Sequence, residues 1–154
     1  MKKLTEPDYT NEPKKIEDVI AEERPKSVVF VACSQRSADC KNVYGLIERV
    51  VKSAEAARAE VTVLPLDLFS EHGRRVVETP ESFEAIFGKY DLAIVGQTCP
   101  CCETNSVVDA LKVLCEVTKG KTYLTTDNKE KLVNPACHGL DGLDGYDLSD
   151  LFVR

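Results

Sequence analysis

Apolar residues along this chain form either short continuous runs or stripes with helical spacing. Ser27–Cys33 is one continuous run rich in β-branched residues, and Asp91–Gln97 contains another. Runs of this length are typical of strands in a parallel sheet that is buried on both faces. Between residues 39 and 59 the apolar positions instead recur at intervals of three and four, which indicates an amphipathic helix. The pattern therefore predicts strands that alternate with helices.

Four further segments extend this alternation. Glu60–Leu66 is predicted to be a strand at one edge of the sheet, because its proline cannot donate a ladder hydrogen bond. A helix is predicted to begin at Thr79-Pro80 and to end at Gly88. A second helix is predicted from Ser106 to about Thr118. The half-polar segment Lys121–Thr126 is predicted to be the strand at the opposite edge.

Repetition of strand and helix favours an α/β fold with a parallel sheet and right-handed crossovers. We expect a flavodoxin-like sheet of about four strands in the order 2-1-3-4, with helices on both faces. Residues 1–26 are polar, of mixed charge and contain three prolines, so they are predicted to form a polar N-terminal arm with at most one short helix. Residues 27–154 are predicted to form a single domain.

The composition narrows the functional classes. The chain has 154 residues, a net charge of -6 and no cluster of lysine and arginine, which argues against nucleic-acid binding. No apolar run is long enough for a membrane span, and no apolar segment typical of a secretion signal follows the first lysines. We therefore expect a cytoplasmic protein. Its seven cysteines are then expected to be thiols, ligands or core residues rather than a disulfide framework.

Cysteines gather where the predicted central strands end. The segment GQTCPCCETN places Cys99, Cys101 and Cys102 directly after one apolar run. Cys33 ends the other run, and Cys40 falls in the first turn of the helix that follows. Because ligands of open parallel sheets bind at the carboxyl ends of the strands, at the switch point, these five residues are predicted to share one crevice.

Two chemistries suit such a cluster. A thiolate is both a nucleophile and a soft metal ligand, and its pKa falls at a helix N-terminus or beside a cation. One interpretation is redox chemistry with Cys33, Cys99 and Cys102 as catalytic thiols, and with a small molecule or a protein as redox partner. The other interpretation is a metal site, holding zinc or an iron–sulfur cluster, with all five cysteines as ligands. Cys115, in the middle of a predicted helix, is interpreted as a core residue.

Two other features extend the candidate list. Cys137 and His138 follow the fourth predicted strand, and they become candidates if the chain beyond that strand reaches the same edge. The loop CSQRSADCKN offers backbone N–H groups and a helix N-terminus to an anion, and Ser34, Arg36, Ser37 and Asn42 are its candidate phosphate contacts.

The segment SVVFVACSQRSADCKN resembles the first strand and phosphate loop of flavodoxin-like FMN proteins. The resemblance implies that Ser34, Ser37 and Asn42 contact the FMN phosphate and that residues 97–102 line the isoalloxazine. An FMN- or nucleotide-binding module is therefore the first alternative function.

The same strand is similar to the opening of low-molecular-weight phosphatases and thioredoxin-coupled arsenate reductases. That resemblance implies that Cys33 is a nucleophile, Arg36 an oxyanion clamp and Cys99 to Cys102 resolving thiols. In those families five residues separate the cysteine from the arginine, whereas only two separate Cys33 from Arg36. A non-catalytic partner subunit of a redox complex is the second alternative function, and the sequence leaves open whether the protein is an enzyme.

Overall fold

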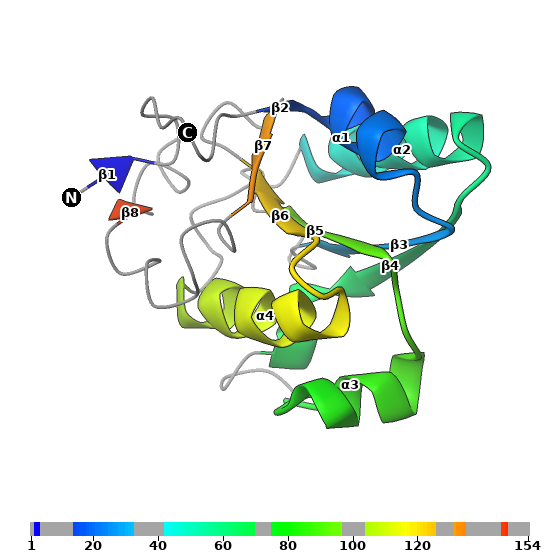
Figure 1. The fold of residues 1–154 in the computed structure, drawn as a ribbon. Helices are drawn as coiled ribbons and strands as arrows, with labels where there is room; N and C mark the ends of the chain where they lie inside the picture. Colours follow the sequence, from blue (N-terminus) through cyan, green and yellow to red (C-terminus); the bar gives the residue numbers. More distant parts are fainter. Residues whose placement is uncertain are drawn as a thin grey trace.

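The computed structural model describes residues 2–3, 14–32, 42–69, 75–96, 104–125, 131–134 and 146–147. These residues form a central sheet between two layers of helices (Figure 1). The helices are α1 (Ile16–Glu23), α2 (Asn42–Ala56), the 3₁₀ helix η2 (Leu66–Phe69), α3 (Pro80–Phe87) and α4 (Thr104–Val117). The strands are β1 (Lys2–Lys3), β2 (Lys14–Lys15), β3 (Ser27–Ala32), β4 (Glu60–Pro65), β5 (Leu92–Gly96), β6 (Thr122–Thr125), β7 (Lys131–Val133) and β8 (Tyr146–Asp147).

The main sheet has six strands in the order β2-β7-β6-β5-β3-β4. Strands β4, β3, β5 and β6 run parallel to one another, and β7 is antiparallel to both β6 and β2. The predicted flavodoxin-like sheet of four parallel strands is therefore wrong, because the sheet is larger and mixed. A separate pair of short parallel strands is formed by β1 and β8.

Two short strands account for this correction. β7 has three residues and β2 has two, both lysines, so neither contains enough residues to give a recognisable alternation of apolar and polar positions. Both nevertheless join the sheet, since Lys14 pairs with Leu132 and Lys15 with Lys131. Their addition turns the predicted edge strand β6 into an interior strand.

The polar residues of β6 are accommodated inside the protein by hydroxyl hydrogen bonds. Thr122 and Thr125 are both fully buried. The Thr118 hydroxyl donates to the carbonyl oxygen of Leu114, and it lies 2.8 Å from the Thr122 hydroxyl. A buried hydroxyl with a hydrogen-bond partner avoids the cost of an unsatisfied polar group. The polar Thr122 is therefore buried against the residue that follows α4, and it is not exposed to solvent.

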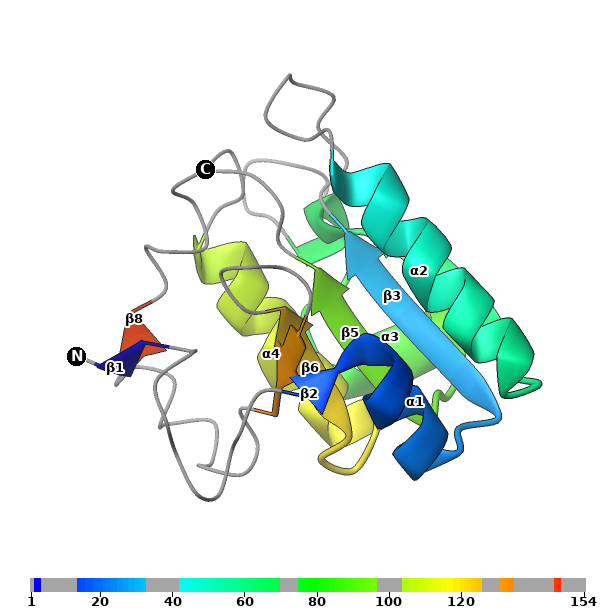
Figure 2. The same ribbon diagram turned by 90° about the horizontal axis from the view of Figure 1, so that it is seen from above.

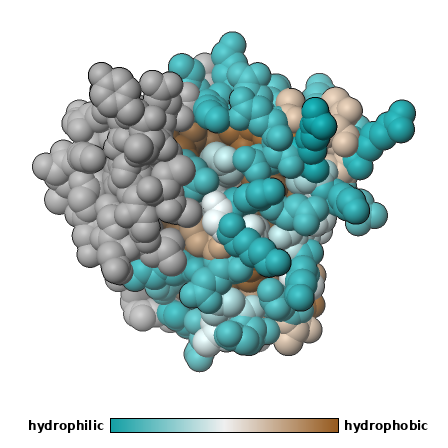
Figure 3. Space-filling model, viewed as in Figure 1, coloured by the Kyte–Doolittle hydropathy of each residue, from teal (hydrophilic) through white to brown (hydrophobic). Residues whose placement is uncertain are grey.

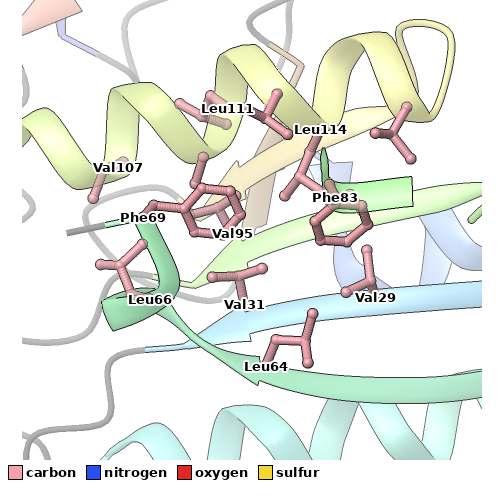
Figure 4. Close-up of a cluster of buried hydrophobic side chains, with 14 of the residues drawn as sticks. Val29, Val31, Leu64, Leu66, Phe69, Phe83, Val95, Val107, Leu111 and Leu114 are labelled. Carbon is pink, nitrogen blue, oxygen red and sulfur yellow. The ribbon is translucent and has the colours of Figure 1, made fainter. Parts of the chain in front are cut away.

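The two faces of the sheet are covered by different helices (Figures 1 and 2). Alternate residues of β3 point to opposite faces: Val28 and Phe30 pack with α1 and α2, whereas Val29 and Val31 pack with α3 and α4. Figure 4 shows the hydrophobic cluster on the α3 and α4 side of the sheet, in which Val29, Val31 and Leu64 lie across from Leu111 and Leu114 of α4. Burial on both faces explains why this strand is apolar at nearly every position.

Both ends of α3 lie at the residues that the sequence predicts. The Ser82 N–H donates to the Thr79 hydroxyl at 3.1 Å, and the Ser82 side chain accepts from the Thr79 N–H at 3.0 Å, so the two residues form a capping box. Gly88 caps the other end, and its φ of 92° lies in the region that favours glycine. The predicted beginning and end of this helix are confirmed.

On the face shown in Figure 3, the described residues present a mainly hydrophilic surface, and the hydrophobic areas are small and separate. The large hydrophobic side chains that the structure exposes are Val63, Val76 and Ile86. Among the described residues, no helix combines the length and the apolar character that a membrane crossing requires.

The segment from Lys14 to Glu23, which the sequence placed in a polar arm, contributes to the core. Ile16, Val19 and Ile20 are buried against Leu92, Ile94, Tyr123 and Leu132 on the α2 side of the sheet. Glu23 accepts a hydrogen bond from the Tyr123 hydroxyl at 3.2 Å and lies 3.5 Å from the Lys121 ammonium. This segment therefore covers β5 and β6, strands that come about 70 to 110 residues later in the chain.

We expect Ile16→Ala to lower the free energy of unfolding by about 2–5 kcal/mol, because the change leaves a cavity beneath α1. The matched control is Ile86→Ala, whose side chain is 53% exposed and whose loss should change stability by less than about 0.5 kcal/mol. Urea unfolding followed by circular dichroism measures both. Equal stability of Ile16→Ala and the unaltered protein would show that α1 does not stabilise the fold.

Candidate functional site at the carboxyl edge of β3 and β5

The connections of the parallel strands reverse direction between β3 and β5. From β3 the chain passes through α2, on one face of the sheet, to β4 on one side. From β5 it passes through α4, on the opposite face, to β6 on the other side. Such a point is where open α/β sheets leave room for a ligand, outside the carboxyl ends of the strands. The carboxyl edge of β3 and β5 is therefore the candidate site.

The two strands end side by side at this edge. Ala32, the last residue of β3, is the register partner of Gly96, the last residue of β5. Residues 33–41 continue from Ala32 to α2, and residues 97–103 continue from Gly96 to α4. Both cysteine-bearing segments of the sequence thus connect to described residues that are direct neighbours in the sheet.

The predicted site residues themselves fall outside the described part of the chain. These residues are Cys33, Ser34, Arg36, Ser37, Cys40, Cys99, Cys101 and Cys102. Asn42 is the first residue of α2, and the position of its side chain is not described. Their convergence in one site therefore stays a prediction that rests on the strand ends from which their segments leave.

Gly96 is required by the packing at this edge. A Cβ atom at Gly96 would lie 2.5 Å from Cζ of Phe30 and 3.1 Å from Cδ2 of Leu46. Phe30 is fully buried and Leu46 is 6% exposed, so an added Cβ atom would have to displace buried side chains. Absence of a side chain at position 96 lets α2 pack closely on β3 and β5, immediately before the segment that carries three cysteines.

Two long helices begin at the same edge. α2 has 15 residues and α4 has 14, and each starts after the segment that leaves a parallel strand. The first turn of a helix carries partial positive charge from its unpaired N–H groups. Thiolates near such a terminus are stabilised relative to thiols, and their pKa falls. The described framework at this edge therefore contains two helix N-termini, whose partial positive charge favours anions that lie close to them.

Cys115, the single cysteine among the described residues, lies away from this edge on the inner side of α4. It is 6% exposed and forms no disulfide. Burial raises the pKa of its thiol from the ordinary 9.0 to about 11, and a hydrogen bond with Thr122 opposes this effect only partly. Its predicted role as a core residue is confirmed.

The chain leaves β7 in the direction opposite to the candidate site. Because β7 is antiparallel to β6, the chain at the end of β7 runs toward the amino end of β6. Asn134, which follows β7, donates from Nδ2 to the carbonyl oxygen of Gly120 at 3.1 Å, just before β6 begins. Cys137 and His138 lie outside the described residues, and the strand reversal removes the reason for expecting them at the cysteine-bearing edge.

No cluster of three or more metal-ligating side chains occurs in the ranges that the structure describes.

The chief feature that sequence reasoning missed is an apolar groove between α1 and α2. Its signal in the sequence is a set of small residues on the two helices, a pattern that also occurs on ordinary solvent-exposed helix surfaces.

Comparisons with protein-family models, curated protein sequences and solved structures find no match to this chain.

We expect Gly96→Ala to destabilise the protein by about 1–3 kcal/mol, since the added methyl group overpacks the core next to Phe30. The matched control is Gly45→Ala in α2, where a Cβ meets no atom within 4 Å. That change should stabilise the protein by roughly 0.5–1 kcal/mol through helix propensity. Thermal and urea unfolding measure both effects, and stabilisation by both variants would contradict the packing argument.

The raised pKa of Cys115 predicts a loss of stability at high pH. Above pH 9 the thiol ionises in the unfolded chain but stays protonated in the folded protein until about pH 11. The unfolded state then binds fewer protons, so stability falls across this window by up to about 3 kcal/mol. Urea unfolding of the protein and of Cys115→Ala between pH 8 and pH 11 measures the difference. Parallel pH profiles for the two proteins would refute this assignment.

Proposed function

We propose that this chain is a thiol-based redox or metal-binding protein whose cysteines act at the carboxyl edge of β3 and β5. One observation carries the proposal: Ala32 and Gly96 are register partners at a point where the strand connections reverse. Cys33 directly follows Ala32, and Cys99, Cys101 and Cys102 follow Gly96 within six residues. This register supports the proposal, because all four cysteines follow strand ends at the edge where such sheets bind ligands.

The helices support the proposal further. Cys40 lies two residues before α2, and Cys102 lies two residues before α4. Partial positive charge at those helix ends would lower the pKa of both thiols and make them better ligands and better nucleophiles. Cys115 has the opposite environment, since burial raises the pKa of its thiol to about 11. The chain therefore contains an internal reference for an unreactive cysteine.

Redox chemistry at this edge would proceed by thiol–disulfide exchange. One thiolate, from Cys33, Cys99 or Cys102, would attack a disulfide of the substrate or partner protein, break its S–S bond and form a mixed disulfide. A second cysteine thiolate would then displace the partner's remaining sulfur and close a disulfide within this chain. The partner gains two electrons and two protons in this exchange, and the cysteine pair loses them.

Metal binding at this edge would use the same thiolates as ligands. Four cysteines are the usual number for an iron–sulfur cluster, and zinc sites also accept four thiolates. Cys33, Cys40, Cys99, Cys101 and Cys102 supply enough sulfur atoms for either group. Arg36 lies between two of these cysteines in the sequence, and its charge would stabilise thiolates or an anionic substrate.

The first experiment is an ultraviolet–visible spectrum of protein purified without oxygen, with metal quantified by mass spectrometry. The metal hypothesis predicts bound zinc, or a broad charge-transfer band with bound iron, and predicts its loss in Cys33→Ser and Cys99→Ser. The redox hypothesis predicts a colourless protein in which a mild disulfide oxidant couples two of these cysteines. Cys115→Ala is the control and should behave like the unaltered protein in both measurements.

Three outcomes would contradict this function. Flavin-like bands would favour an FMN-binding module that uses Ser34, Ser37 and Asn42. A metal-free protein that binds a redox partner equally well with Cys33 and Cys99 replaced by serine would indicate a non-catalytic subunit. Equal rates of thiol modification for Cys99 and Cys115 would show that the thiols at the carboxyl edge are not activated.

A further inference from the structure

A groove lies between α1 and α2, on the side of these helices that faces away from the sheet. Its volume is about 460 Å³, which falls within the range of small-molecule sites. This space is left open by small side chains: Ala21 on α1, Ala56 at the end of α2 and Ala57 directly after it. Ile20, which is 1% exposed, forms part of its floor. The α1–α2 groove is therefore an apolar trough built entirely from described residues.

Polar groups at one end of the groove are already satisfied by each other. Arg49 donates to Glu17 through Nε at 2.6 Å and through Nη2 at 2.9 Å, a bidentate pair. These hydrogen bonds lower the pKa of the Glu17 carboxyl below its ordinary value. The Ser53 hydroxyl donates to the carbonyl oxygen of Arg49 at 2.8 Å. Because both Glu17 oxygens are engaged, this end offers little to a cationic ligand.

Arg24 lines the opposite end and remains available. Its backbone has a φ of 47°, and its N–H caps α1 by donating to the carbonyl oxygen of Ile20 at 3.1 Å. Within the described ranges, no carboxylate forms an ion pair with its guanidinium. The N–H groups of an arginine guanidinium can form two parallel hydrogen bonds with the two oxygens of a carboxylate.

We propose that the α1–α2 groove binds an amphipathic carboxylate, with its apolar chain against Ile20, Ala56 and Ala57 and its carboxylate on Arg24. One effect opposes this orientation, since α1 and α2 both end here and their C-termini carry partial negative charge. Direct bidentate hydrogen bonds from a guanidinium are stronger than the solvent-screened end of a helix dipole, so the anion is favoured. This site is independent of the cysteine site, which lies at the other end of α2.

The test is a titration with octanoate, followed through the backbone amide signals of the ¹⁵N-labelled full-length protein. We expect saturable binding at one site, with the largest shifts at Ile20, Ala21 and Ala57. 1-Octanol and octylamine are the matched probes, and each should bind about ten-fold more weakly because neither offers a guanidinium the two anionic oxygens of a carboxylate. Equal or tighter binding of either probe would overturn the carboxylate assignment.

Substitutions distinguish the contribution of the Arg24 charge to binding from the contribution of the apolar groove. Arg24→Gln should weaken octanoate about ten-fold and leave 1-octanol unchanged. Ala56→Leu should weaken both probes, because the larger side chain fills the trough, and this exposed helical position accepts leucine without loss of fold. Arg58→Gln changes a neighbouring exposed arginine that does not line the groove, and it should have no effect. Octanoate binding that is non-saturable, or unchanged in Arg24→Gln and Ala56→Leu, would refute the site.

Discussion

The parallel pairing of β3 with β5 is the constraint on which the rest of the structure depends. Backbone groups of these two strands are removed from water on both faces, so their hydrogen bonds must be made within the sheet. Burial on both faces requires two layers of helices, and right-handed connections assign α2 to one layer and α4 to the other. Ala32 and Gly96 then end side by side, and the chain leaves the sheet there in two segments rich in cysteine.

This arrangement links stability to the proposed chemistry through a few residues. Gly96 lets α2 approach the sheet, and that approach brings the N-terminus of α2 close to the edge where the strands end. In the proposed site, thiolates would gain from the N-terminus of α2 only if that helix end is held in place, and the buried side chains of Phe30 and Leu46 fix α2 against the sheet. If the proposed site is correct, a loss of packing at position 96 would alter the electrostatic environment of its thiols as well as the free energy of unfolding.

Sequence patterns identify the strands whose burial is uniform and miss those whose burial depends on distant contacts. β3 and β5 are apolar at almost every position, so their central place could be read directly. β6 looked like an edge strand, because the partner of Thr122 is a hydroxyl on Thr118 that no periodicity indicates. β7 and β2 are too short for a pattern, and α1 contains only three buried residues among charged ones. The cysteines are visible in the sequence as a motif, but they lie outside the described residues, so their convergence in one site stays a prediction.

The two proposed sites lie at opposite ends of one helix, and this separation makes each a control for the other. α2 has 15 residues and therefore spans about 22 Å from the cysteine-bearing edge to Ala56 in the α1–α2 groove. Substitutions that far apart and without shared partners normally have additive effects. Arg24→Gln should leave thiol reactivity unchanged, and Cys33→Ser should leave octanoate binding unchanged. A coupling between them would require α2 to shift as a rigid body, and the close packing of Leu46 and Val50 beneath it opposes such a shift.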